Sequence, residues 1–149
     1  MLELVPVHKD NWRAVRELEL KAGQQTFLHT NLYSLAEAFV KPDAPEYLPL
    51  VICEDGEVVG FAMIARDPEA DLHWISRFMI DAQHQGRGLG RAGMLLVLDF
   101  MKQCPSCANV HLSVSADNAV ALALYASLGF VPTGEKEGEG QDIYRVHVR

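Results

Sequence analysis

The sequence predicts an α/β protein built on one mixed sheet of about seven strands with about four helices. Two apolar runs flank an Asp-Gly turn, which is typical of an antiparallel hairpin. A glycine-rich loop at residues 85–91 joins a β-rich apolar run to a helical one, which favours a β-α-β crossover to a parallel strand. The expected order is β-α-α-β-β-β-α-β-α-β-β, in a single domain over residues 1–149.

Composition places the chain among ordinary globular proteins. It has 149 residues, of which 49% are hydrophobic and 22% charged. The net charge of −7 disfavours non-specific nucleic-acid binding, which depends on neutralising backbone phosphates. No apolar run reaches the roughly 18–20 residues that span a bilayer, and the N-terminus lacks the layout of a signal peptide. We expect a cytoplasmic protein with no nucleic-acid or membrane partner.

The N-terminal part predicts one strand and two helices. The strand covers residues 2–7, and Asn11 is placed to cap the first helix. Its apolar face consists of Trp12, Val15 and Leu18. Ser34 and Glu37 have the spacing of a capping box that opens the second helix. An extended connector is expected at Pro42, Pro45 and Pro49.

The rest of the chain predicts a meander, one crossover and a final hairpin. The expected strands cover residues 50–53, 58–64, 72–81, 110–114, 130–133 and 143–148. The expected helices cover residues 89–102 and 119–127. Asp117 or Asn118 is placed to cap the second of these helices, and Gly129 to end it.

The glycine loop predicts a phosphate site. Gly86, Gly88 and Gly90 stand at alternate positions just where a helix begins, so backbone N–H groups are not covered by side chains. A helix N-terminus has unpaired N–H donors and a partial positive charge, which together favour a phosphate or pyrophosphate. The ligand is still open at this point.

A dinucleotide is the first alternative, because residues 88–93 match the G-x-G-x-x-G fingerprint. Two features weigh against it. Residues 81–87 separate the strand from these glycines, and the remaining chain is too short for a second mononucleotide-binding half. A Walker loop is excluded because no Gly-Lys-Ser/Thr follows.

A second motif follows the next strand and reads Asn118-x-x-Ala121-x-x-Leu124-Tyr125-x-x-x-Gly129-Phe130. Together with Gln85-x-x-Gly88-x-Gly90, it resembles the GNAT superfamily of acetyl-CoA-dependent N-acetyltransferases over nearly the whole chain. The resemblance implies the GNAT fold and an enzyme that uses no metal. It also implies direct transfer of acetyl from acetyl-CoA to a primary amine through a tetrahedral intermediate.

The resemblance also implies site residues. Those expected at coenzyme A are Phe78, Met79, Ile80, Gln85, Gly86, Arg87, Gly88, Leu89, Gly90, Arg91, Asn118, Ala121 and Tyr125. The backbone of residues 85–91 would hold the pyrophosphate. The bulged strand end at residues 78–80 would pair with pantetheine in a V-shaped gap beside residues 110–114, and a backbone N–H near Met79 or Ile80 would polarise the acetyl carbonyl. Tyr125 would protonate the departing thiolate.

Both helix residues also have a purely structural interpretation. Tyr125 could be a core aromatic residue of an amphipathic helix, and Asn118 could be simply its N-cap. With the glycine loop in place, we favour the functional interpretation.

A narrower resemblance concerns the acceptor. Gln25-x-Phe27-x-x-x-Asn31-x-x-Ser34-x-Ala36-Glu37 and Trp74-Ile75-x-Arg77-Phe78-Met79-Ile80-Asp81 are similar to the bacterial spermine/spermidine acetyltransferase branch. A polyamine suits an acidic protein. The expected substrate-binding residues are Gln25, Phe27, Asn31, Glu37, Glu54, Asp71, His73 and Trp74. The acidic turn at residues 135–142 is a further candidate wall.

Several alternatives remain open at the acceptor. The base that deprotonates the amine is unassigned among His73, Glu54 and Asp71. The acceptor could instead be a protein, an amino acid or an aminoglycoside, and a non-catalytic CoA sensor is the rival class. A homodimer, common in this fold, is a further expectation.

The cysteines raise one more alternative. Cys104 and Cys107 have the spacing of a redox or zinc half-site. A zinc ribbon needs a second pair, and the third cysteine, Cys53, is alone. The pair also follows a helix, which is not the thioredoxin arrangement. The sequence favours a loop with two thiols.

Overall fold

The computed structural model describes residues 1–22, 24, 29–41 and 46–149, and the elements follow the predicted order. The strands are β1 (Leu2–Pro6), β2 (Glu46–Glu54), β3 (Glu57–Asp67), β4 (Leu72–Ile80), β5 (Asn109–Ser115), β6 (Val131–Lys136) and β7 (Gln141–His147). The helices are α1 (Trp12–Glu17), α2 (Asn31–Val40), α3 (Leu89–Lys102) and α4 (Ala119–Ser127), with a short 3₁₀ helix, η2, at Ala82–His84. None of the described helices is long and apolar enough to cross a membrane.

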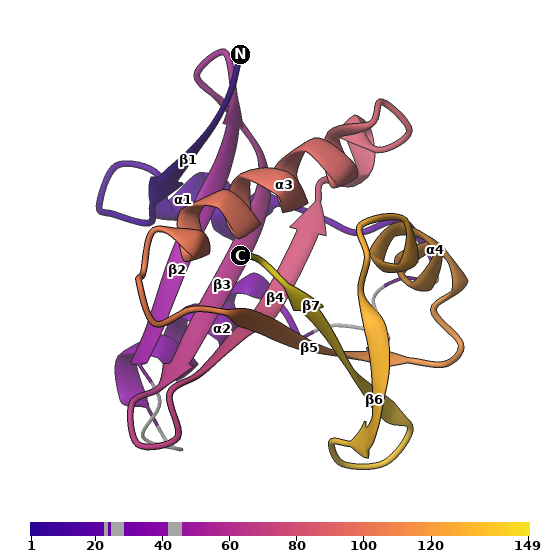
Figure 1. Cartoon of the computed structure of the whole chain (residues 1–149). Coiled ribbons are helices and arrows are strands. Elements are labelled where there is room, and N and C mark those ends of the chain that lie inside the picture. Colours follow the sequence, from indigo (N-terminus) through magenta and orange to yellow (C-terminus); the bar gives the residue numbers. More distant parts are fainter. Residues whose placement is uncertain (23, 25–28, 42–45) are drawn as a thin grey trace.

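The strands form one mixed sheet in the order β1-β2-β3-β4-β5-β7-β6 (Figure 1). All neighbouring strands are antiparallel except β4 and β5, which are parallel. The connection between these two is α3, as a parallel pair requires a crossover. The predicted mixed sheet is confirmed.

Helices cover both faces of the sheet, and each face has its own core. Neighbouring residues of β2 point to opposite faces: Leu50 packs in the core with Met94 of α3, and Val51 in the core with Val15 of α1. Both β2 residues are fully buried. The sheet is therefore the central layer, with α3 on one face and α1 and α2 on the other.

The two halves of the sheet meet at a short junction. The register of β4 with β5 has only two pairs, His73↔Val110 and Trp74↔His111. Beyond them β4 and β5 diverge, and the gap between them widens toward the C-terminal end of β4 (Figure 1). On its other edge β4 has a bulge, because its register with β3 shifts between Met63 and Ile64. The expected bulged strand and V-shaped gap are both present.

Gly60 keeps β3 and β4 close at the end of the bulged strand. A Cβ at this position would lie 2.7 Å from the Met79 carbonyl oxygen, so only glycine fits without a shift of the backbone. Just before the start of β3, the Asp-Gly hairpin is as predicted. Asp55 (φ 50°) and Gly56 (φ 86°) are both left-handed, which the two-residue turn between twisted strands requires.

Two local predictions are wrong at helix ends. Leu18 lies outside α1, which ends at Glu17. The second helix is capped by Thr30, whose hydroxyl accepts the Tyr33 N–H at 3.1 Å, and Ser34 is buried inside the helix. Thr30 therefore supplies the cap one turn earlier than the Ser34 spacing suggested.

Pro49 is in β2 and not in a connector. The register between β1 and β2 ends at Leu50. Pro49 lies one residue beyond it, so its missing N–H removes no hydrogen bond between β1 and β2. The other two prolines of the expected connector, Pro42 and Pro45, lie outside the described residues.

Candidate functional site

A cavity of about 240 Å³ lies at the open end of the β4–β5 gap. The residues that line it come from the end of β4, the glycine loop, β5 and α4. Those expected at coenzyme A are Phe78, Met79, Ile80, Gln85, Gly86, Gly90, Asn118, Ala121 and Tyr125. Leu20, Gln24, Ser113, Val114, Ser115, Val120, Leu124 and Gln141 also line it and were not predicted. We call this the thioester cavity.

The glycine loop has its backbone open on one side. Gly86 (φ 80°) and Gly88 (φ 77°) are left-handed, and a Cβ on either would meet nothing within 4 Å. Gly88 directly precedes α3, makes no side-chain cap, and the first turn holds no acidic residue. The first N–H groups of a 14-residue helix therefore lie at a glycine-lined end without acidic side chains, which favours an anion.

Three predicted residues of the loop do not line the cavity through their side chains. Leu89 is buried in the core with Ile80, so only its backbone can reach a ligand. Arg87 instead forms an ion pair with Glu54 of β2 at 2.7 Å. Arg91 is exposed in the first turn of α3.

Gln85 has a bracing role. Its side-chain amide donates to the Ile80 carbonyl at 2.9 Å and to Gln24 Oε1 at 3.0 Å. These bonds tie the loop to the end of β4 and to the chain after α1. The Gln85 side chain therefore positions the loop, and its backbone is what remains for a ligand.

Asn118 and Tyr125 line the cavity from the side of α4, with Asn118 at the N-cap and Tyr125 within the helix. Asn118 Oδ1 accepts the Ala121 N–H at 3.3 Å, so the expected N-cap is present at a residue that also lines the cavity. The Tyr125 ring packs at 5.6 Å, centroid to centroid, against Phe130. Burial raises the pKa of the Tyr125 phenol to about 12, so the hydroxyl is protonated at neutral pH.

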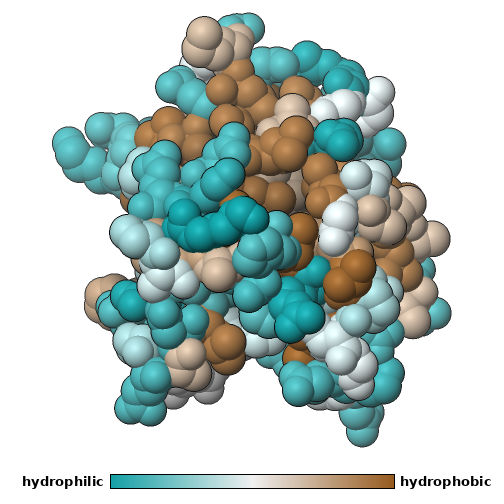
Figure 2. All heavy atoms as spheres, in the orientation of Figure 1, coloured by the Kyte–Doolittle hydropathy of each residue, from teal (hydrophilic) through white to brown (hydrophobic). Residues whose placement is uncertain are grey.

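A second cavity, of about 550 Å³, opens on the narrow side of the gap, and we call it the acidic cavity. Its lining includes three carboxylate residues, Asp67, Glu69 and Glu137, and two aromatic residues, Tyr47 and Trp74. Figure 2 shows this face hollowed at its lower edge, with hydrophilic residues beside the hollow. Ser113 of β5 lines both cavities, so the two meet across the sheet.

The expected acceptor residues are divided among several places. Trp74 lines the acidic cavity. Glu37 forms an ion pair at 3.2 Å with Arg77, which lines the same cavity, and both side chains are only 16% exposed. Asn31 is buried, donates to the Val15 carbonyl at 3.0 Å, and lines a third cavity of about 370 Å³ between α1 and α2.

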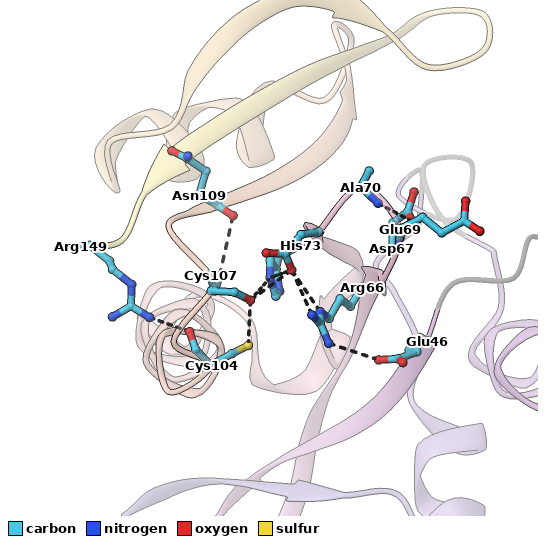
Figure 3. A network of polar contacts seen from close by, with 12 residues as sticks. Glu46, Arg66, Asp67, Glu69, Ala70, His73, Cys104, Cys107, Asn109 and Arg149 are labelled. Carbon is cyan, nitrogen blue, oxygen red and sulfur yellow. Dashed lines mark hydrogen bonds and ion pairs between the residues drawn. The ribbon is translucent and has the colours of Figure 1, made fainter.

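The other expected acceptor residues lie elsewhere or are not described. Glu54 is at the glycine loop, paired with Arg87. Asp71 and His73 lie at the far end of β4, in a polar network with Arg66 (Figure 3). Neither Asp71 nor His73 lines the thioester or the acidic cavity, and His73 lines a separate pocket with Phe100 and Met101 of α3. Gln25 and Phe27 lie outside the described residues.

No group of three or more His, Cys, Asp or Glu side chains in the described part of the chain is placed to hold a metal ion. The polar groups of the two main cavities are backbone groups, amides, hydroxyls, carboxylates and the Arg77 guanidinium. Such a set suits a phosphorylated cosubstrate and a polar or cationic acceptor.

Comparison with known proteins defines the class. Residues 12–130 match the model of the acetyltransferase (GNAT) family. The chain belongs to this family, and it is an acetyl-CoA-dependent N-acetyltransferase.

Two relatives show the extent of the similarity in sequence. The chain is 28% identical over 148 residues to the spermine/spermidine N(1)-acetyltransferase of Bacillus subtilis, covering 95% of both chains. It is 40% identical over 96 residues to the N-alpha-acetyltransferase RimI of Mycobacterium tuberculosis, covering 61% of this chain and 54% of the relative.

Solved structures share the fold. Ard1 from Thermoplasma volcanium has a TM-score of 0.75 at 20% identity, with 99% of this chain and 98% of that chain covered. A spermidine N-acetyltransferase from Vibrio cholerae, in complex with CoA and spermine, has a TM-score of 0.71 at 18% identity, with 98% and 95% covered. The predicted GNAT fold is confirmed.

Proposed function

We propose that this enzyme acetylates a primary amine of a polyamine such as spermine or spermidine. The observation that carries the proposal is the meeting of two unlike cavities at Ser113. The thioester cavity has the open helix N-terminus and no ionised side chain among the described residues that line it. The acidic cavity has three carboxylates and two aromatic rings, and both groups attract ammonium ions.

In this proposal the glycine loop holds the pyrophosphate of acetyl-CoA through the backbone of residues 85–91. The pantetheine arm then lies along the unpaired edge of β4 at residues 78–80, because β4 has no strand partner there on the side of β5. Backbone N–H groups on that edge near Met79 or Ile80 are free to donate to the acetyl carbonyl. Such a donor stabilises the oxyanion of the tetrahedral intermediate.

Tyr125 is proposed as the proton donor. The amine nitrogen forms a bond to the acetyl carbon, the C–S bond breaks, and one proton passes in net from nitrogen to sulfur. A phenol with a pKa of about 12 is present as the donor at every physiological pH. Since it is a weaker acid than a thiol of pKa about 8.5, its proton moves in step with the loss of a proton from the attacking nitrogen.

The acceptor is proposed to enter through the acidic cavity. Its Arg77 is neutralised by Glu37, so the excess charge of the lining is negative. The cavity between α1 and α2 is a poorer site for a polycation, because its lining includes the cation Arg16 beside the single carboxylate Glu19. The carboxylates Glu69 and Glu137 would hold the distal ammonium groups while one neutral amine reaches Ser113.

The test is release of free thiol from acetyl-CoA with spermine, spermidine, amino acids, peptides and aminoglycosides. We expect the highest kcat/KM with a polyamine. Preference for a peptide N-terminus would instead support protein acetylation, the second candidate, which the 40% identity to an N-alpha-acetyltransferase favours. Thermal stabilisation by CoA without turnover of any acceptor would contradict catalysis and indicate a CoA sensor.

A further inference from the structure

The turn between α3 and β5 brings two thiols together. The Cys107 N–H donates to the Cys104 carbonyl at 3.0 Å, so the four residues from Cys104 to Cys107 close a β-turn. The two Cα atoms of such a turn lie within about 7 Å, and disulfides span Cα distances of about 4.4–6.8 Å. Both cysteines also pack against the same core under α3. The backbone therefore holds the pair at a distance that a disulfide can bridge.

The two thiols are in opposite environments, and Cys104 is the accessible one. Its sulfur is partly exposed and lies 3.4 Å from Ser106 Oγ. Ser106 in turn lies 3.1 Å from Asp71 Oδ1 and 3.4 Å from His73 Nε2 (Figure 3). The Ser106 hydroxyl, with its backbone N–H and the nearby charge of Arg66, holds the pKa of the Cys104 thiol below its usual value.

Cys107 is fully buried, with its sulfur 3.7 Å from the Asn109 carbonyl. Burial raises the pKa of the Cys107 thiol. A partly exposed thiol with a lowered pKa, beside a buried thiol with a raised pKa, is the asymmetry that favours attack by the first and closure by the second. The third cysteine, Cys53, is buried in the core on the opposite face of the sheet, with Val15 and Phe61.

We propose that Cys104 and Cys107 are a reversible dithiol–disulfide site that peroxides oxidise. The Cys104 thiolate attacks the O–O bond, which gives a sulfenic acid and, after protonation, one water. The Cys107 thiol then attacks the Cys104 sulfur, forming the S–S bond and releasing a second water. In total the dithiol loses two electrons and two protons, and hydrogen peroxide is reduced to two waters.

The position of the turn links this site to both halves of the enzyme. α3 begins at the glycine loop and ends at the turn, and β5 begins two residues after Cys107 and carries Ser113. A disulfide would place a covalent ring between these two elements. The number of free thiols distinguishes the oxidised from the reduced enzyme, whichever acceptor the enzyme uses.

The test is thiol counting after oxidation of the full chain. The reduced protein is treated with a small excess of hydrogen peroxide, denatured in N-ethylmaleimide and digested. We expect the three alkylated cysteines to fall to one, Cys53, with a peptide that links Cys104 to Cys107 and full recovery after dithiothreitol. Three free thiols after oxidation, a link through Cys53, or a link between two chains would each overturn the proposal.

Variants separate the roles of the thiols. Cys53→Ser should still close the ring, and Cys107→Ala should leave Cys104 as a sulfenic acid that dimedone labels. Ser106→Ala should slow alkylation of native Cys104 at pH 7 by about threefold, because it removes the hydroxyl that favours the thiolate. Alkylation of Cys104 no faster than that of Cys53 in the native protein would also contradict the site.

Discussion

The thioester cavity and the acidic cavity lie on the two sides of one gap, yet different kinds of chemical groups line them. The thioester cavity is lined mainly by the end of β4, the glycine loop, β5 and α4, and the glycine loop offers it open backbone groups. The acidic cavity collects side chains from β2, the β3–β4 turn, β4, β5 and the β6–β7 turn. In the proposed function, the first cavity holds acetyl-CoA and the second holds the acceptor amine.

This difference in lining indicates which groups would recognise each of the two substrates. A pyrophosphate and a thioester are recognised by N–H groups whose directions the helix N-terminus and the strand edge fix. An amine is recognised by charges and rings whose arrangement depends on the tertiary fold. Substitutions on the two sides should therefore change different kinetic constants.

The largest effect is expected at Tyr125, the proposed proton donor. Tyr125→Phe removes the donor and should lower kcat about 10²-fold while the Kd for CoA changes little. Steady-state kinetics and CoA titration measure the two quantities. Tyr33→Phe on the half-exposed face of α2 is the matched control and should leave kcat unchanged. Near-normal turnover of the Tyr125 variant would remove this residue from the mechanism.

The next effect is expected at the glycine loop. Gly88→Ala adds a methyl group where the pyrophosphate would lie and strains a left-handed backbone, so the KM for acetyl-CoA should rise about tenfold. The KM for the amine should stay within twofold. Gly134→Ala is the control, since it has a similar φ of 87° and open space in β6, far from the loop in sequence. An equal rise in both variants would show that backbone strain alone is responsible.

A smaller effect is expected in the acidic cavity. Glu137→Gln and Glu69→Gln should each raise the KM for spermine about threefold to fivefold, with the KM for acetyl-CoA unchanged, because each removes one attractive charge from a solvated cavity. The effect should shrink in 0.5 M salt. Glu139→Gln, in the same exposed turn but outside the lining, is the control. Equal changes at Glu137 and Glu139 would place the acceptor elsewhere.

The smallest effect concerns stability at high pH. The folded protein raises the pKa of Tyr125 from about 10 to about 12, so the folded state favours the neutral phenol. This contribution is fully present below pH 10 and is lost as the pH rises from 10 to 12. Urea unfolding at pH 9 and pH 11 should show a steeper loss for the wild type than for Tyr125→Phe. The same loss in both would contradict a shifted Tyr125.

The contrast between the two cavities also explains which site residues the sequence could predict. The glycine loop and the α4 motif are local patterns, so most of the residues expected in the thioester cavity lie there. His73 and Trp74 are neighbours in sequence, but only Trp74 reaches the acidic cavity, because successive strand residues point to opposite faces. Glu54 pairs with Arg87 because the β2–β3 hairpin lies beside the glycine loop in the folded protein. No local sequence pattern predicts this contact.

Ser113 was missed for a similar reason. Its alternation with the buried residues Leu112 and Val114 could have placed it on the face of the sheet opposite to the core under α3. Nothing in the sequence says that both cavities end there. The expected homodimer stays a prediction, which sedimentation velocity would test.

The most direct test of the two-sided site is a crystal structure of the enzyme with CoA and spermine. We predict that the CoA sulfur lies near Tyr125 and that spermine occupies the acidic cavity, beside Trp74 and Glu137, with one amine at Ser113. Spermine bound in the cavity between α1 and α2, beside Arg16, would contradict this account.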